Sequence, residues 1–114
     1  MNTADASAPL VLLECLVAGT THRPNLKQHE PGLYLGQPLR LIREADSKYD
    51  DWAVQVHTEA TDSVPAVWLG YLPEGRNETV ARLLEAGKNI TARLVHKSWE
   101  EDWLYLEIEV LLND

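Results

Sequence analysis

The sequence is poor in positive charge. Its 114 residues include 10 Lys and Arg against 18 Asp and Glu, which gives a net charge of −8 at pH 7. Proteins that hold nucleic acid along its phosphate backbone usually carry a basic face or groove. The composition therefore excludes a long-range attractive field for DNA or RNA, and any such contact must come from a local site.

Cysteine and long apolar runs are also scarce, and phenylalanine is absent. The single cysteine, Cys15, excludes an intramolecular disulfide and is compatible with a reducing compartment, so we expect a cytoplasmic protein. Because Cys15 lies in an apolar stretch, we expect its thiol to be buried and unreactive. Apolar runs such as residues 10–13 are far too short to span a bilayer, so we expect no membrane partner. Residues 1–8 lack the basic start of a signal peptide and are predicted to form a flexible tail.

The sequence shows no pattern typical of a catalytic or metal site. The four histidines are widely scattered, whereas zinc sites usually include at least one close pair of ligands. No Ser-His-Asp or Cys-His spacing is present. We therefore expect no metal, no cofactor and no enzyme activity.

The remaining features are typical of one small β-rich domain, which we place at residues 9–114. A chain of this length can bury a single core. Apolar or alternating segments predict about six strands, at residues 10–19, 39–44, 52–58, 67–73, 89–96 and 103–112. The sequence thus predicts a mainly β fold, a small OB-like antiparallel barrel with one main α-helix. Residues 20–38 hold three Pro and are expected to be an irregular connection.

The one predicted helix covers residues 78–87. Val80, Leu83 and Leu84 have the i, i+3, i+4 spacing of a single apolar stripe, which we expect to face the barrel. Asn77 is suited to the N-cap position, and Gly87 to the position just after the helix, where a left-handed backbone conformation is common.

The connection between the second and third predicted strands concentrates charge and aromatic groups. It reads READSKYDDWAV, at residues 43–54. Aspartate is favoured in turns because its side chain accepts hydrogen bonds from nearby backbone N–H groups, and this explains Asp46 and Asp51. By spacing alone the same explanation holds for Asp50.

The segment around this connection, LRLIREADSKYDDWAVQV, resembles the HIRAN domain. The resemblance continues in order along the chain, through VAGT, GQPLRLIRE, WLGYLPEGRNETVARLLEAG and LEIEV, and covers roughly residues 14–110. HIRAN domains occur as stand-alone bacterial proteins and as modules on SWI2/SNF2-type DNA translocases. The resemblance implies an OB-like fold and a non-catalytic module that binds the 3′-hydroxyl end of single-stranded DNA, in DNA repair or replication-fork processing.

The resemblance also implies where the site lies. Tyr49 and Asp50 match a Tyr-Asp pair that forms the floor of the 3′-end pocket, with the Asp accepting the terminal hydroxyl. Arg43 matches the Arg that opens the turn, and Tyr71 stands where a DNA-binding member has His. The expected nucleic-acid-binding residues are Tyr49, Asp50, Arg43, Tyr71, Lys48 and Trp99.

One departure leaves a second hypothesis open. Cys15 and Leu16 occupy the approximate positions of an Arg-Tyr pair, whose Tyr stacks on a base in the DNA-binding member. Together with the net charge of −8, this departure is compatible with a protein-interaction module that has lost DNA binding. The partner would then be a protein such as a helicase or nuclease.

Overall fold

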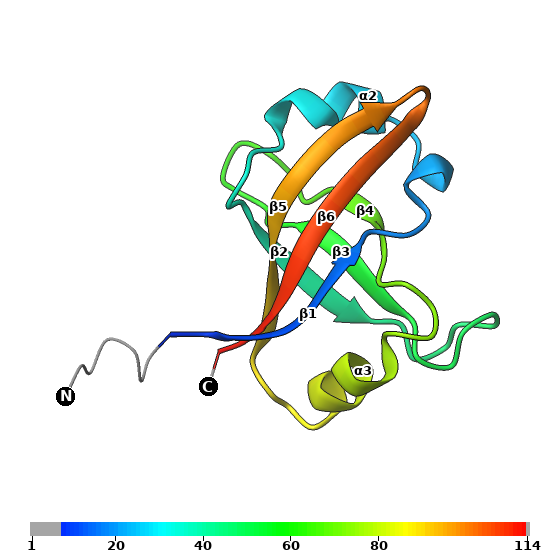
Figure 1. Cartoon of the computed structure of the whole chain (residues 1–114), viewed down its shortest axis with the longest axis vertical. Helices are drawn as coiled ribbons and strands as arrows, with labels where there is room; N and C mark the ends of the chain where they lie inside the picture. Colours follow the sequence, from blue (N-terminus) through cyan, green and yellow to red (C-terminus); the bar gives the residue numbers. More distant parts are fainter. Residues whose placement is uncertain (1–7, 114) are drawn as a thin grey trace.

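The computed structural model describes residues 8–113, so the predicted tail lies almost wholly outside the described residues. Six antiparallel strands form one curled sheet in the order β1-β6-β5-β2-β3-β4 (Figure 1). The strands are β1 (Leu10–Leu16), β2 (Pro38–Arg43), β3 (Val54–Thr58), β4 (Trp68–Tyr71), β5 (Ile90–Glu100) and β6 (Trp103–Leu112). The main helix is α3 (Glu78–Glu85). Within residues 8–113, no helix has the length and apolar content needed to cross a membrane.

The two edges of the curled sheet meet beyond the end of β1. The backbone N–H of Ala18 donates to the carbonyl oxygen of Tyr71 at 2.7 Å, and the N–H of Tyr71 donates back to Ala18 at 2.9 Å. This approach requires glycine at position 70, because a Cβ there would lie 2.3 Å from the Ala18 carbonyl oxygen. The Ala18–Tyr71 seam gives the sheet the form of a small barrel, as the sequence predicted.

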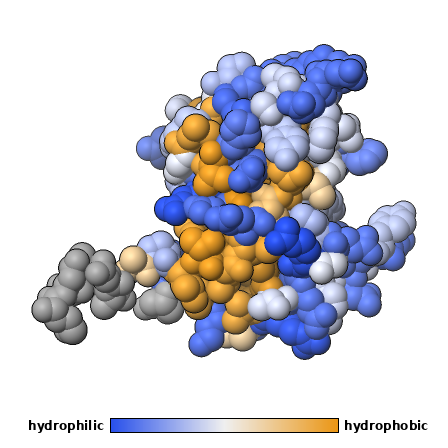
Figure 2. Space-filling model, in the orientation of Figure 1, coloured by the Kyte–Doolittle hydropathy of each residue, from blue (hydrophilic) through white to orange (hydrophobic). Residues whose placement is uncertain are grey.

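The core follows the strand alternation. Successive side chains on a strand point to opposite faces, so every second residue of β3 and β6 is buried, as are Leu39 and Leu41 of β2. Cys15 is 5% exposed, as predicted, and burial raises the pKa of its thiol to about 11. On the face seen in Figure 2, hydrophobic residues gather over the middle of the molecule and hydrophilic residues cover its ends. The largest fully buried apolar side chains are Leu39, Leu69, Leu72, Leu94, Leu106 and Ile108.

Helix α3 packs its apolar stripe on the barrel, as predicted. Val80 is buried, and Leu83 and Leu84 pack against the core. The helix ends where expected: Gly87 has a φ of 78°, its N–H donates to Leu84 O, and the next N–H donates to Leu83 O. Asn77 holds the N-cap position, but its side chain does not cap the helix.

The connection at residues 20–38 is more ordered than the sequence indicated. It contains three short helical turns: η1 (Thr20–His22), α2 (Leu26–His29) and η2 (Glu30–Gly32). The sequence did not predict these turns because Pro and Gly in this segment indicate irregular structure, and each turn is too short to show a helical period. Strand β5 is longer than predicted because residues 97–100 continue the hairpin with β6. Side chains of this extension hold the connection in place, since Lys97 and Trp99 both donate to the Glu30 carboxylate.

Candidate functional site

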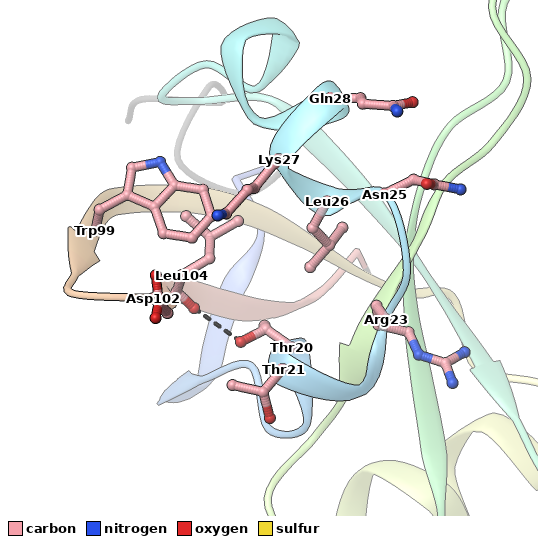
Figure 3. A pocket seen from close by; sticks show the side chains of 10 residues that line it. All are labelled: Thr20, Thr21, Arg23, Asn25, Leu26, Lys27, Gln28, Trp99, Asp102 and Leu104. Carbon is pink, nitrogen blue, oxygen red and sulfur yellow. Dashed lines mark hydrogen bonds between the residues drawn. The ribbon is translucent and has the colours of Figure 1, made fainter.

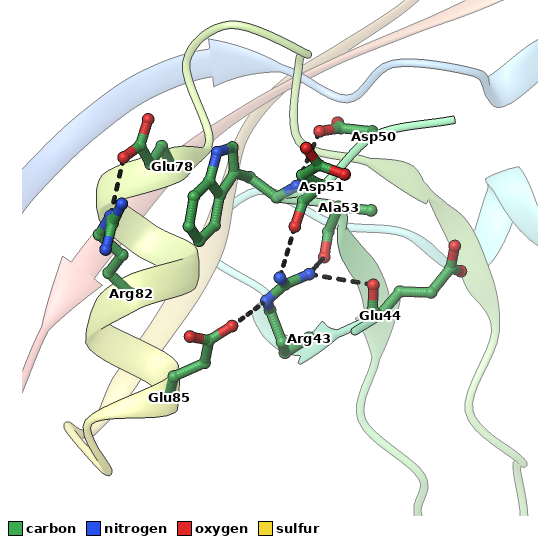
Figure 4. Close-up of polar contacts among 9 residues, drawn as sticks. Arg43, Glu44, Asp50, Asp51, Ala53, Glu78, Arg82 and Glu85 are labelled. Carbon is green, nitrogen blue, oxygen red and sulfur yellow. Dashed lines mark hydrogen bonds and ion pairs between the residues drawn. The ribbon is translucent and has the colours of Figure 1, made fainter. Parts of the chain in front are cut away.

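Arg43 organises the charged turn between β2 and β3 (Figure 4). Its Nη1 donates to the carbonyl oxygens of Glu44 and Ala53, both at 3.0 Å, and its Nη2 donates to the carbonyl of Asp51 at 2.5 Å. Its Nε donates to Glu85 of α3 at 2.7 Å. Four of the five guanidinium N–H groups therefore bind the protein itself, and the side chain is only 14% exposed. Arg43 closes the base of the turn and ties it to the helix.

Asp50 is the second tie between the turn and α3. One carboxylate oxygen accepts the backbone N–H of Trp52 at 2.9 Å, and the other accepts the side-chain amide of Asn77 at 2.7 Å. Asn77 is 2% exposed, and this buried amide donates to Asp50, while no side-chain hydrogen bond caps the helix. Each carboxylate oxygen can accept a further hydrogen bond, so Asp50 is a fixed acceptor with spare capacity.

Tyr49 stands on this rigid base with its side chain free. It is 92% exposed, the most exposed large hydrophobic residue in the described part of the chain. Lys48 beside it is exposed as well and forms no salt bridge among the described residues. A large aromatic ring held in water on an ordered turn is available to stack on a planar ligand.

Two hollows flank Tyr49 and Asp50. The first, here named the Tyr71 hollow, has a volume of about 250 Å³ and lies between the turn and the Ala18–Tyr71 seam. The second, of about 370 Å³, lies between the turn and the start of α3. The main polar groups of the Tyr71 hollow belong to Glu44, Ser47, Tyr49, Asp50, Tyr71 and Glu74. Its lining therefore carries three carboxylates and no Lys or Arg.

Hydrogen bonds fix the charge of the Tyr71 hollow. Glu44 Oε1 accepts from Gln55 Nε2 at 2.6 Å and from the Tyr71 hydroxyl at 2.8 Å. The hydrogen bond from Gln55, with a further contribution from Tyr71, holds the pKa of Glu44 below its usual value. Burial, followed by the bond to Glu44, raises the pKa of Tyr71. At neutral pH the hollow thus presents an ionised Glu44 and a protonated Tyr71.

The structure brings together Tyr49, Asp50 and Tyr71 around one hollow, with Arg43 behind the turn. It does not bring Trp99 there. Trp99 lines a separate hollow of about 350 Å³, facing Leu26 and Lys27 at the hairpin end of the barrel (Figure 3), whereas the turn is tied to α3 at the other end (Figure 1).

Two contributors to the site escaped the sequence analysis. Glu44 ended a predicted strand and Asn77 was a predicted helix cap, and neither was among the expected nucleic-acid-binding residues. Gln55 was one sequence signal of a polar site, because it is a polar residue on the outward face of β3. In the structure it lies opposite Tyr71. The contact between Asp50 and Asn77 joins residues 27 positions apart, and no local pattern predicts it.

Comparisons with known proteins agree with this fold. The sequence matches the model of the HIRAN domain over residues 10–113, nearly the whole chain. A crystal structure of a protein from Lactobacillus plantarum, a structural genomics target, is similar with a TM-score of 0.74 at 24% identity. The alignment covers 92% of this chain and 97% of that one, and at this identity it shows the fold alone. No curated protein matches the sequence. The chain therefore belongs to the HIRAN domain family, a family of nucleic-acid-binding modules.

Proposed function

We propose that the protein binds the 3′-hydroxyl end of single-stranded DNA in the Tyr71 hollow. The observation that carries this proposal is the pairing of a fixed acceptor, Asp50, with the freely exposed ring of Tyr49 at the rim of one hollow. Asp50 accepts the terminal hydroxyl, and Tyr49 stacks on the base or sugar of the last nucleotide.

The acidic lining of the Tyr71 hollow favours a hydroxyl over a phosphate. An ionised carboxylate can only accept hydrogen bonds, so it binds an O–H group and repels a second anion. Glu44 and Glu74 add to the repulsion from Asp50. Two unit charges 4 Å apart repel by about 1 kcal/mol in bulk water and by about 4 kcal/mol near a protein surface. A 3′-phosphate should therefore bind at least about tenfold more weakly than a 3′-hydroxyl.

Tyr71 contributes by shape and position. Its hydroxyl donates to Glu44, which holds the ring as a wall of the hollow. Unlike the His at this place in a DNA-binding member, Tyr71 offers no positive charge to a phosphate. Arg43 contributes as the support of the turn. Lys48 is the exposed cation closest in sequence to Tyr49 and is the candidate for a phosphate contact.

The departures from the DNA-binding pattern limit the affinity. Leu16 cannot stack on a base as the Tyr of the DNA-binding member does, so Tyr49 provides the stacking at this end. Stacking contributes about 1–3 kcal/mol per base, and a hydrogen bond to a charged group about 1.5–3 kcal/mol. We infer modest, end-dependent binding by a non-catalytic module that serves DNA repair or replication-fork processing beside other proteins.

A titration with labelled oligonucleotides tests this proposal. Oligonucleotides of identical sequence that end in a 3′-hydroxyl or a 3′-phosphate would be titrated at about 50 mM salt and followed by fluorescence anisotropy. The 3′-hydroxyl form should bind at least about tenfold more tightly. Equal affinity for both ends would refute end capture, and no binding to either would direct attention to a protein partner.

A further inference from the structure

A row of aromatic and cationic side chains crosses the outer face of β2, β3 and β4. Arg40 on β2 is paired with His57 on β3, and the His57 ring lies parallel to that of Trp68 on β4, with centroids 5.8 Å apart. The Arg23 guanidinium covers the Trp68 ring at 3.7 Å. Tyr71 meets the same ring edge-on at 5.6 Å. We name Arg23, Arg40, His57 and Trp68 the Arg23–Trp68 patch, which adjoins the Tyr71 hollow through Tyr71.

The cations of this patch are not neutralised by ion pairs. Among residues 8–113, the salt bridges take up Arg43, Arg82, Arg93 and Lys97, but neither Arg23 nor Arg40. Both arginines act on His57. Burial, followed by the positive charges of Arg40 and Arg23, lowers the pKa of His57. His57 is therefore a neutral flat ring at pH 7, between two guanidinium groups. On a chain of net charge −8, the patch holds two positive charges outside any salt bridge of the described residues, and the Arg23 charge also acts on Glu44 of the neighbouring hollow.

The geometry of Arg23 suits a phosphate. A guanidinium stacked on an indole is held flat, and its N–H groups point outward from its edge in the fork that matches two phosphate oxygens. Arg23 stands at the rim of the hollow at the hairpin, but Figure 3 shows its side chain pointing away from Trp99 and Lys27, and its guanidinium covers Trp68. Arg40 is exposed and reaches solvent on the same face.

We propose that the Arg23–Trp68 patch binds the phosphodiester backbone of the strand whose 3′ end occupies the Tyr71 hollow. This inference rests on the proposed function and extends it to the internal nucleotides. The acidic hollow and the cationic patch together would orient the bound strand. The hollow repels phosphates but accepts the uncharged 3′-hydroxyl, so the 3′ end lies in the hollow. The internal phosphates then lie on Arg23 and Arg40.

Variants of each arginine test the patch. A 3′-hydroxyl octanucleotide would be titrated between 50 and 200 mM salt against Arg23→Gln, Arg40→Gln and the control Lys88→Gln, which removes the same charge from the loop after α3. Removing one arginine that binds a phosphate should reduce the slope of log K against log salt by about 0.7 and weaken binding about eightfold at 50 mM. Arg23→Lys should recover most of the slope, because it keeps the charge. Arg23→Gln removes both a charge and a contact with Trp68, whereas Arg40→Gln removes a charge and leaves the Arg23–Trp68 contact in place. Comparing the two variants separates the effect of charge from the effect of packing.

The outcomes distinguish this inference from the proposed function. If both Arg→Gln variants behave like Lys88→Gln while the 3′-hydroxyl preference persists, the patch does not bind phosphates and the proposal of end capture stands. If Arg23→Gln weakens binding but no end preference exists, the patch is supported without end capture. If the wild-type protein binds neither oligonucleotide, both are overturned.

Discussion

Replacing Asp50 with asparagine isolates the charge that we propose reads the 3′ end. Asp50→Ala would confound the result, because Asp50 also accepts hydrogen bonds from Trp52 N and Asn77 Nδ2. An asparagine can still accept from Trp52, and Asn77 can turn its own amide to present oxygen to the new NH₂ group. The turn should therefore survive Asp50→Asn while the negative charge is removed.

The magnitude follows from the difference between charged and neutral hydrogen bonds. A bond to an ionised group contributes about 1.5–3 kcal/mol and a neutral one about 0.5–1.5 kcal/mol, so the loss is about 1–1.5 kcal/mol. That difference weakens binding of the 3′-hydroxyl oligonucleotide about 5- to 13-fold. Binding of the 3′-phosphate form should improve, because one of the three carboxylates of the hollow is gone. The preference for hydroxyl should therefore nearly vanish.

The assay is a paired titration of both oligonucleotides by anisotropy, with thermal unfolding as the check on the fold. Asp51→Asn is a matched control, since Asp51 lies in the same turn and uses only its backbone carbonyl to hold Arg43. If Asp50→Asn retains the full preference while its unfolding matches that of the wild type, Asp50 does not read the hydroxyl.

Four further outcomes are expected. Arg43→Gln should lower the free energy of unfolding by about 2–4 kcal/mol, measured in urea, because three carbonyls of the turn lose the Arg43 donor and Glu85 loses its partner. An unchanged urea midpoint would contradict the role assigned to Arg43. Gly70→Ala should cost about 3 kcal/mol or more, since a Cβ meets the Ala18 carbonyl at 2.3 Å, and a fully stable variant would show that the seam can open without penalty. Burial raises the pKa of Cys15 from 9.0 to about 11, so its thiolate fraction at pH 8 is roughly 100-fold below that of a free thiol. A disulfide reagent should therefore modify Cys15 slowly until the protein unfolds or the pH approaches 11. Tyr49→Ala should weaken both oligonucleotides alike, by about 1–3 kcal/mol, without changing the urea midpoint, because the exposed ring contributes no burial.

The sequence predicted the fold well because its strands have a strong period. Leu39 and Leu41 are buried with the exposed Arg40 between them, and the alternation in β6 is nearly complete. The Schellman ending of α3 was readable from Gly87, since glycine at that position has a local conformational cause. The short turns of residues 20–38 were missed because tertiary burial of Leu26 and Leu33, not a local period, holds them.

The site was only partly readable. Tyr49 and Asp50 could be singled out by resemblance, but sequence alone could not show that Arg43 spends its donors on the turn. That role depends on the carbonyls of Glu44, Asp51 and Ala53 converging on one guanidinium, which is a property of the folded backbone. The stack of Arg23 on Trp68 joins residues 45 positions apart and was equally out of reach.

Under the proposed function, the Ala18–Tyr71 seam would couple opening of the barrel to occupancy of the hollow. Two backbone hydrogen bonds join the edges there, and Ala18, Gly19 and Tyr71 from both sides of the seam line the Tyr71 hollow. A DNA strand end bound there as proposed would touch both edges at once and would be held less tightly when they separate. At a ligand concentration 100 times the dissociation constant, opening then costs about 2.7 kcal/mol more than in the free protein. Amide hydrogen exchange at positions 18 and 71 would slow about a hundredfold under those conditions, so the barrel itself reports whether its ligand is present.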